Sequence, residues 1–251
     1  MQYNPFSLEG KNILVTGASS GIGRQAAIEC SRMGARIMIT GRNEERLQET
    51  FSLLNDSNVN HSFIQADLLD EESVGILVSQ VGQLDGVVFC AGKGLTLPVQ
   101  FATRDKMDDI FNTNFFSTFE LLRLLYKKKK LNKSASLVLI SSLGGTYIFS
   151  GGNSIYGASK AALNSMMKFC AKEFSSRMIR VNSICPGMVD TPLIHRGTIS
   201  EEQLEQDKLR YPLKRYGKPE DVAYLSVYLL SDASSWVTGQ DFVVDGGVSI
   251  K

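Results

Sequence analysis

The strongest constraint on the fold of this chain is a repeated pattern, in which a short apolar run precedes a longer amphipathic stretch. The run NILVT at residues 12–16 precedes a helical pattern over 24–33, and RIMIT at 36–40 precedes another over 43–54. Continuous apolar runs of about five residues indicate strands buried on both faces. Their alternation with helices is typical of parallel strands joined by right-handed crossovers. We therefore predict an α/β fold, a single doubly wound parallel sheet of the Rossmann type flanked by helices on both faces. Further strands are expected at Ser62–Ala66, Gly86–Cys90, Leu137–Ser141, Arg180–Cys185 and Phe242–Val244, and further helices at Glu71–Val81, Met107–Tyr126, Ala158–Ser175 and Pro219–Leu230.

The composition narrows the classes of function. The 251 residues carry a net charge of +1 and contain no repeat or linker-like segment, so we expect a single domain over 1–251. A charge so close to zero argues against binding to nucleic acid or to an anionic membrane. No apolar run reaches the roughly 18 residues of a membrane span, and no signal segment is evident. We therefore expect a cytoplasmic protein.

Cysteine and histidine do not suggest a metal site or a disulfide framework. His61 and His195 are distant from each other in sequence, and structural or solvated roles are expected for both. The four cysteines are widely spaced in apolar stretches, which favours reduced core residues: Cys30, Cys90, Cys170 and Cys185.

A glycine-rich turn, TGASSGIG at residues 16–23, follows the first predicted strand. Glycines let the backbone turn sharply and approach a pyrophosphate, and the next helix directs its positive end at the same anion. The spacing G-x-x-x-G-x-G is a weak pattern alone, and its place after a first strand strengthens it. The cofactor contacts expected in this turn are Gly17, Ser19, Ser20, Gly21, Ile22 and Gly23.

The same turn also spells G-x-S-x-G, the nucleophile elbow of a serine hydrolase, with Ser19 as the nucleophile. That fold needs several strands before the elbow, and only one predicted strand precedes Ser19. A hydrolase is therefore the less favoured alternative.

Tyr156 and Lys160, within the sequence YGASK, lie four residues apart on a predicted helix. This spacing places them on one face, about 6 Å apart along the axis. An ammonium group beside a phenol favours the phenolate, as does the positive charge of an oxidised nicotinamide, so we expect a lowered pKa for Tyr156. Such a tyrosine can transfer a proton when a carbonyl and an alcohol interconvert. A tyrosine and a lysine at this spacing are common on helix surfaces. A catalytic role is favoured here because their helix follows a strand that ends in serine and lies downstream of the cofactor turn.

The motifs TGASSGIG and YGASK, with Pro186-Gly187 and the closing VVDGG, resemble the short-chain dehydrogenase/reductase family over almost the whole chain. The resemblance implies that Ser142 binds the substrate oxygen, with its neighbour Ser141 as the alternative. It also implies that Asn114 completes a water-linked proton path with Lys160. The catalytic residues expected on this basis are Asn114, Ser142, Tyr156 and Lys160, and Asn114, Tyr156 and Lys160 also contact the cofactor.

The expected cofactor is NADP(H). Rossmann proteins that prefer NAD place an acidic residue at the end of the second strand, whereas this chain has Gly41 followed by Arg42, whose guanidinium suits a 2′-phosphate. Phe89 and Cys90 replace two asparagines of the family, so side-chain hydrogen bonds should differ in that turn. The resemblance implies further cofactor contacts at Asp67, Leu68, Ala91, Gly92, Pro186, Gly187, Val189 and Thr191.

The substrate is less constrained by the sequence. The segment 217–247 most resembles that of 3-oxoacyl-carrier-protein reductases, and sugar, polyol and steroid dehydrogenases share it. We expect NADPH-dependent reduction of a carbonyl to a secondary alcohol, with a 3-oxoacyl thioester first and a keto-sugar, polyol or steroid as the alternative. A non-catalytic NADP-binding protein is disfavoured, since all four catalytic positions are filled. A substrate loop is expected at about 187–212, where Met188, Leu193 and Ile194 are candidates either for pocket lining or for core packing.

One conspicuous charge run, at residues 127–130, ends a predicted helix. Cations are favoured at a helix C-terminus, so a solvated helix end is the default interpretation. The alternative is a docking site, together with Arg177, for an acidic acyl carrier protein. Relatives assemble as homo-tetramers through two long helices and the C-terminal strand, and we expect the same assembly here.

Overall fold

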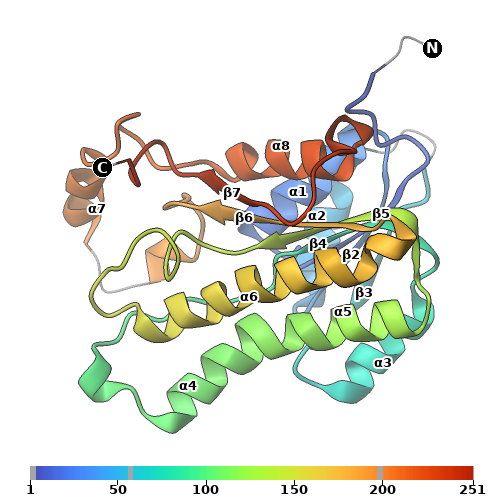
Figure 1. Cartoon of the computed structure of the whole chain (residues 1–251). Coiled ribbons are helices and arrows are strands. Elements are labelled where there is room, and N and C mark those ends of the chain that lie inside the picture. Colours follow the sequence, from blue (N-terminus) through green and yellow to red (C-terminus); the bar gives the residue numbers. More distant parts are fainter. Residues whose placement is uncertain (1–3, 56–58, 197–199, 251) are drawn as a thin grey trace.

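The computed structural model describes residues 4–55, 59–196 and 200–250, and in these residues seven parallel strands form one sheet (Figure 1). The strands follow the spatial order β3-β2-β1-β4-β5-β6-β7. The doubly wound sheet expected from the sequence is thereby confirmed. Its strands are β1 (Asn12–Thr16), β2 (Arg36–Gly41), β3 (Ser62–Gln65), β4 (Leu84–Phe89), β5 (Leu131–Ile140), β6 (Arg180–Pro186) and β7 (Asp241–Val244).

Helices cover both faces of this sheet (Figure 1). One face is covered by α1 (Gly21–Arg32), α2 (Glu44–Ser52) and α8 (Pro219–Leu230). The other is covered by α3 (Glu71–Gln80), α5 (Ser117–Lys127) and α6 (Ser154–Glu173). Two shorter helices, α4 (Arg104–Phe111) and α7 (Glu201–Lys208), lie towards one end of the molecule.

The apolar runs are continuous because both faces of each central strand are buried. In β1, Leu14 packs into the core beneath α3, α5 and α6, while Ile13 and Val15 pack into the core beneath α1 and α8. A strand exposed on one face would alternate apolar and polar side chains instead. Three of the cysteines are buried as expected, whereas Cys90 is partly exposed.

The order of the strands reverses beside β1, because β2 lies on one side of β1 and β4 on the other. Ligands of open α/β sheets bind beyond the carboxyl ends of the strands at such a point. The sequence motifs gather at this edge: the glycine turn follows β1, Gly92 follows β4, Ser142 follows β5 and Gly187 follows β6. The fold therefore brings the predicted site residues to one edge.

Three elements differ from the sequence-based expectation. The helix expected at 107–126 extends over 104–127 and contains one π-helical turn, Asn112–Phe116. The fifth strand begins at Leu131 instead of Leu137, because its first part contains exposed polar residues that hide it from a hydrophobic pattern. One of these, Ser134, has a positive φ of 65°. The helix α7 lies within the stretch 187–212, which was expected to be a substrate loop, and the other α-helices and strands differ from expectation only at their ends.

At the amino edge of the sheet, Asp85 joins three strands. Its Oδ2 accepts a hydrogen bond from the Asn12 backbone nitrogen at 2.9 Å, and its Oδ1 accepts one from Asn132 Nδ2 at 2.7 Å. These contacts connect the start of β4 to the starts of β1 and β5.

We predict that Asp85→Ala lowers the free energy of unfolding by about 1–3 kcal/mol, since both donors lose their acceptor. Asp85→Asn keeps one side-chain oxygen and should lose less. Urea unfolding measures both variants, and an unchanged midpoint for Asp85→Ala would show that solvent replaces the two bonds.

Candidate active site

The glycine turn after β1 packs directly against the turn after β4. Gly17 has a φ of +64°, and a Cβ atom on it would lie 2.8 Å from the Ala91 backbone nitrogen. A Cβ atom on Gly23 would lie 2.4 Å from the Gly17 oxygen. The helix α1 begins at Gly21 without a side-chain cap on Ser20, so its first backbone N–H groups can bind an anion. The turn therefore fits the pyrophosphate of a dinucleotide.

Thr16, which the sequence analysis did not single out, holds the turn after β4. Its Oγ1 accepts hydrogen bonds from the backbone nitrogens of Cys90 at 3.1 Å and Ala91 at 3.2 Å, and Thr16 is fully buried. The Cys90 thiol in turn hydrogen-bonds the Gly23 backbone. These bonds connect the two turns in this chain, where the asparagines of the family are replaced. The position of Thr16, directly before the first glycine of the turn, is the feature of the sequence from which this role could have been predicted.

The adenosine end of the expected cofactor site lies at the ends of β2 and β3. A Cβ atom on Gly41 would lie 3.6 Å from Ser19 Oγ, and the next residue, Arg42, is exposed. After β3, the Asp67 carboxylate accepts a hydrogen bond from the Leu69 backbone nitrogen at 3.0 Å, while Leu68 packs against the core. Gly41, Ser19 and the exposed Arg42 therefore lie together at the end of β2.

Arg24 is a second residue that the sequence analysis did not identify. Its guanidinium donates to the Ser19 oxygen at 2.8 Å and forms an ion pair with Glu49 at 2.9 Å. Arg24 thus fixes the backbone of the glycine turn from the side of α2. Only the fold could identify this contact, because Glu49 lies 25 residues further along the chain.

Ser142, which follows β5, meets Tyr156 of α6 through a side-chain hydrogen bond. The loop between them folds over the pair, because a Cβ atom on Gly144 would lie 3.5 Å from Ser142 Oγ and 3.9 Å from the Tyr156 ring. The alternative serine, Ser141, is buried and its hydroxyl donates to the Lys160 carbonyl oxygen at 3.0 Å. The geometry therefore favours Ser142 over Ser141 as the residue that faces a substrate.

Lys160 is buried below Tyr156 on the same helix, at 6% exposure. Its Nζ donates to the Ile140 oxygen at 2.9 Å, and burial lowers the pKa of this ammonium to about 8. Burial also raises the pKa of the Tyr156 phenol, with the hydrogen bond from Ser142 opposing the shift. The groups of the chain alone therefore do not produce the expected lowering of the Tyr156 pKa, which also relied on the positive charge of an oxidised nicotinamide. Removal of the phenol from water outweighs the hydrogen bond from Ser142.

Asn114 lies in the π-helical turn and is fully buried. Its Oδ1 accepts from the Lys93 backbone nitrogen at 2.8 Å, and its Nδ2 donates to the Lys93 oxygen at 3.0 Å and to Ser159 Oγ at 3.1 Å. A Cβ atom on Gly92 would lie 3.1 Å from Asn114 Oδ1 and 3.4 Å from Lys160 Nζ. A side chain at position 92 would therefore contact both of the residues that are expected to share a proton path.

The loop after β6 crosses over the glycine turn. A Cβ atom on Gly21 would lie 3.2 Å from Thr191 Cγ2, and the Gly187 backbone nitrogen donates to the Val244 oxygen at 3.0 Å. Val189 is buried, while Gly187 and Thr191 are partly exposed. The residues expected to contact a nicotinamide therefore border the same site as Tyr156.

The three lining candidates of the substrate loop divide into two groups. Met188 and Ile194 pack against the small core formed by Leu204, Tyr211 and Tyr216, so they are packing residues. Leu193 is 48% exposed, and a Cβ atom on Gly94 would lie 3.8 Å from its Cδ1. Leu193 alone of the three faces the loop that follows β4.

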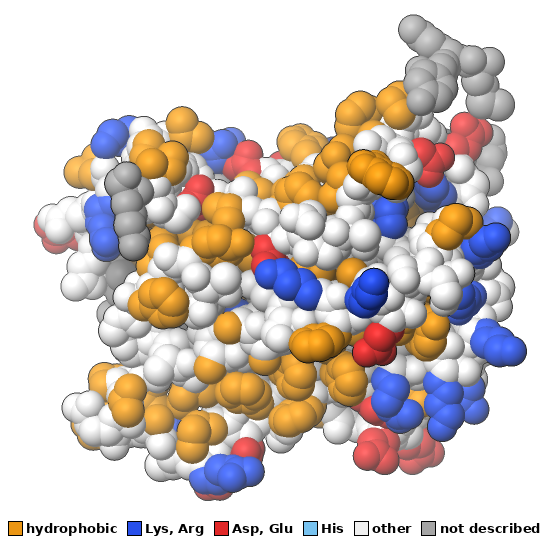
Figure 2. Space-filling model, in the orientation of Figure 1, with side chains coloured by type: hydrophobic (Ala, Val, Ile, Leu, Met, Phe, Trp, Pro, Cys, Tyr) orange, Lys and Arg blue, Asp and Glu red, His pale blue; other side chains and the backbone are white. Residues whose placement is uncertain are grey.

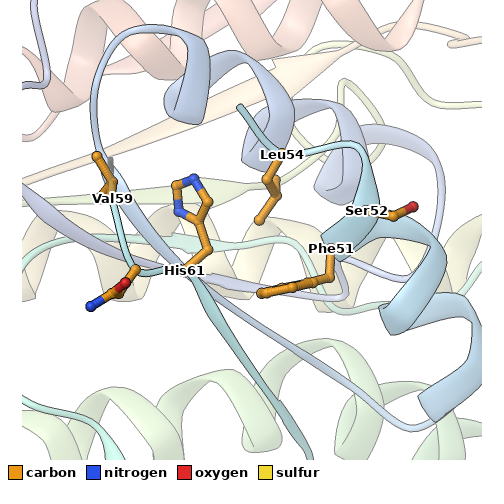
Figure 3. A pocket seen from close by; sticks show the side chains of 6 residues that line it. Phe51, Ser52, Leu54, Val59 and His61 are labelled. Carbon is orange, nitrogen blue, oxygen red and sulfur yellow. The ribbon is translucent and has the colours of Figure 1, made fainter. Parts of the chain in front are cut away.

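Both histidines have partners away from the glycine turn. His61 lines a hollow at the amino edge of the sheet (Figure 3), where its Nδ1 accepts from the Ile37 backbone nitrogen at 3.1 Å and its Nε2 donates to the Asn55 oxygen at 2.8 Å. His195 pairs with Asp190 at 2.7 Å. Neither completes a Ser–His pair with Ser19, which removes the support for a hydrolase.

Within residues 4–55, 59–196 and 200–250, no three His, Cys, Asp or Glu side chains are grouped so that they could hold a metal ion. In the same part of the chain, no helix has the length and hydropathy of a membrane span.

Comparison with known proteins agrees with this geometry. The family model described as enoyl-(acyl carrier protein) reductase matches residues 17–249. A tropinone reductase homologue of Arabidopsis thaliana is 34% identical over 98% of this chain and 95% of its own length. A 3-oxoacyl-(acyl-carrier-protein) reductase of Rickettsia conorii is 36% identical over 96% and 98%.

Solved structures of similar proteins share this fold over almost the whole chain. A putative NAD(P)-dependent gluconate 5-dehydrogenase from Beutenbergia cavernae with bound NADP is 29% identical, with a TM-score of 0.90 over 99% of this chain and 100% of the other. The RhlG/NADP active-site complex of Pseudomonas aeruginosa gives the same identity, TM-score and coverage. The chain belongs to the short-chain dehydrogenase/reductase family. It is accordingly an oxidoreductase of that family.

The burial of Lys160 predicts a specific dependence of stability on pH. Below about pH 8, Lys160 is protonated in both the folded and unfolded states, and burial of the ammonium group destabilises the fold. Between about 8 and 10.5, the folded state releases this proton first, so the cost disappears as pH rises.

We therefore expect wild type to gain about 1–3 kcal/mol of unfolding free energy relative to Lys160→Met between pH 7 and pH 10. Urea unfolding of both proteins at the two pH values measures this difference. A difference that does not change with pH would show that the ammonium group is not desolvated.

Proposed function

We propose that this oxidoreductase uses NADP(H) to reduce a carbonyl compound to a secondary alcohol, with Ser142, Tyr156, Lys160 and Asn114 as its catalytic group. The observation that carries the proposal is the hydrogen-bonded Ser142–Tyr156 pair, which lies above the buried Lys160 at the edge that also holds the glycine turn. The family to which the chain belongs supports the reaction type.

The two hydroxyl groups have distinct tasks in this proposal. The bound nicotinamide supplies the hydride. Ser142 hydrogen-bonds the substrate oxygen and orients it, and Tyr156 donates the proton to that oxygen. Burial raises the pKa of Tyr156, so its phenol carries the proton that reduction of a carbonyl requires.

Lys160 and Asn114 lie behind Tyr156 and serve the return of the proton. Lys160 Nζ donates to the Ile140 oxygen and lies beside Asn114 Oδ1 under Gly92. With a pKa of about 8, its ammonium group can release a proton more readily than a solvated lysine. These two residues are proposed to pass protons from solvent to Tyr156 after each turnover.

We predict that Tyr156→Phe retains cofactor affinity and loses turnover by at least the roughly 10²–10⁴-fold that general acid catalysis contributes. The phenyl ring keeps its packing, and only the proton donor is removed. NADPH absorbance measures turnover and fluorescence titration measures binding.

Tyr224→Phe is the matched control for this experiment, because Tyr224 is 58% exposed on α8. Its turnover should equal that of wild type. Near-normal turnover of the Tyr156→Phe protein with any active carbonyl would refute the proton-donor role.

The preference for NADP(H) is proposed from the end of β2. Gly41 provides no carboxylate to repel a 2′-phosphate, Arg42 is exposed directly beside it, and Ser19 Oγ faces the same place. Two similar solved structures are described with bound NADP, which supports the proposal.

We expect Arg42→Ala to weaken NADPH binding by roughly tenfold to a hundredfold, the value of a lost charge-assisted hydrogen bond. Affinity for NADH should barely change, because NADH has no 2′-phosphate. Fluorescence titration with both cofactors measures this, and Arg104→Ala, at an exposed site on α4, is the control. Equal weakening of both cofactors would mean that Arg42 does not bind the phosphate.

We propose that an acyl carrier protein, if it binds to the cations at the end of α5, delivers its substrate to the active site of a neighbouring subunit and not to that of the subunit it binds. Lys127 and its two successors are exposed at the end of α5, but they directly precede β5 and lie at the amino edge of the sheet. Ser142 follows the opposite end of that ten-residue strand. Arg177 is held by the Leu131 oxygen and by the Tyr126 ring. These cations therefore do not line the mouth of their own site.

We further propose a homo-tetramer. The outer surface of α5 and α6 carries exposed Phe119 and Phe169 beside a hollow that is also lined by Met166, and Figure 2 shows hydrophobic side chains along this face. At the edge of the sheet, Val243 of β7 is 38% exposed and Trp236 is 98% exposed. Apolar patches of this kind favour contact with another subunit.

A further inference from the structure

Three loops meet around Ser142 and Tyr156 at the carboxyl edge of the sheet. They are residues 91–103 after β4, 141–153 after β5 and 187–196 after β6, and we call them together the rim. The Leu97 backbone nitrogen donates to the Gly152 oxygen at 2.6 Å, which joins the first loop to the second. The first loop also approaches the third at Gly94 and Leu193. A substrate that reaches Ser142 must therefore pass between these loops.

The rim exposes large apolar side chains from each of its loops. The exposed fractions are 69% for Val99, 56% for Phe101, 81% for Phe149 and 48% for Leu193. Contiguous exposed apolar surface is unfavourable in water and typically marks a binding site. Figure 2 shows hydrophobic side chains gathered on the side of the molecule where α4 and the loop after β5 lie. Each of the three loops of the rim thus presents at least one large apolar side chain to solvent.

The same loops offer little charge to a substrate. The stretch 141–153 contains no acidic or basic residue. Lys93, in the loop after β4, forms an ion pair with Asp109, and His195, in the loop after β6, pairs with Asp190. The structure does not describe the side chain of Arg196. Each of the other two cations of the rim thus already forms an ion pair with a carboxylate. An anionic substrate would have to displace one of these carboxylates or remain uncompensated.

We infer that the substrate is an uncharged carbonyl compound with a large hydrocarbon body, a ring system or a chain, next to its carbonyl group, in preference to a keto acid or sugar acid. The inference rests on the proposed carbonyl reduction. The carbonyl oxygen meets Ser142 and Tyr156, and the hydrocarbon body lies against Val99, Phe149 and Leu193. Removal of this body from water supplies the binding free energy that the rim cannot supply through charge.

A pair of probes that share one aryl ketone, one a neutral methyl ester and the other a carboxylate, tests the inference. Methyl benzoylformate and benzoylformate share one ketone and one ring, but only the second carries a carboxylate. The full chain with NADPH should reduce the ester with a kcat/KM about tenfold or more above that of the acid, because Lys93 and His195, the rim cations whose side chains the structure describes, are already paired with carboxylates.

The rim side chains are tested with the same ester. Phe149→Ser and Val99→Ser should each raise its KM by about threefold to tenfold, while the KM for butane-2,3-dione and for NADPH stays unchanged. Leu53→Ser is the matched control, since Leu53 is 53% exposed at the end of α2, away from the rim. Wild-type KM for the ester in both rim variants, or an equal rise in the Leu53 variant, would overturn the role of the rim.

A measurement of substrate binding without turnover tests this inference independently of the proposed reaction. Calorimetry on the Tyr156→Phe protein with saturating NADPH measures the affinity for ester and acid without turnover. Tighter binding of the ester supports the inference even if wild type reduces neither compound, in which case the proposed reaction fails instead. Equal affinities, or tighter binding of the acid, would overturn the inference whatever the turnover.

Discussion

The site depends on the close backbone approach between the turn after β1 and the turn after β4. Gly17 and Gly23 permit this approach, because a Cβ atom on either would overlap neighbouring backbone atoms. The Thr16 hydroxyl then holds the second turn through two backbone amides. Because β1 and β4 are neighbours at the point where strand order reverses, this contact places the start of α1 beside the ends of β4 and β5. The candidate catalytic group and the expected cofactor turn share one edge for this reason.

Burial controls the chemistry at that edge. Tyr156 and Lys160 belong to one helix that packs against the sheet, and removal from water shifts both groups towards their neutral forms. The cost of holding an ammonium group there is reduced by the Ile140 carbonyl. Asn114 lies close to the same place, in the π-helical turn that interrupts the long helix. Such turns are frequent at functional sites, where they re-aim a side chain.

The amino edge of the sheet stabilises the fold, whereas the carboxyl edge carries the candidate site. At the amino edge, polar side chains complete backbone hydrogen bonds: Asp85 and His61 bind strand amides, and Lys130 Nζ donates to the Val81 oxygen at the end of α3. At the carboxyl edge, backbone groups and apolar side chains remain accessible. A stable scaffold at one edge leaves the loops at the other free to differ among relatives, which is where substrate preference is decided.

The sequence by itself determined the order of strands and helices, the glycine turn and the family, because burial and spacing are recorded locally in runs such as NILVT and YGASK. Tertiary structure decided what depends on partners distant in the chain. It separated Ser142 from the buried Ser141, revealed Thr16, and placed the lysines at 127–129 at the edge opposite Ser142. It also reversed the expected direction of the Tyr156 pKa shift. The spacing of Tyr156 and Lys160 is a property of one helix, whereas desolvation depends on everything that packs around it.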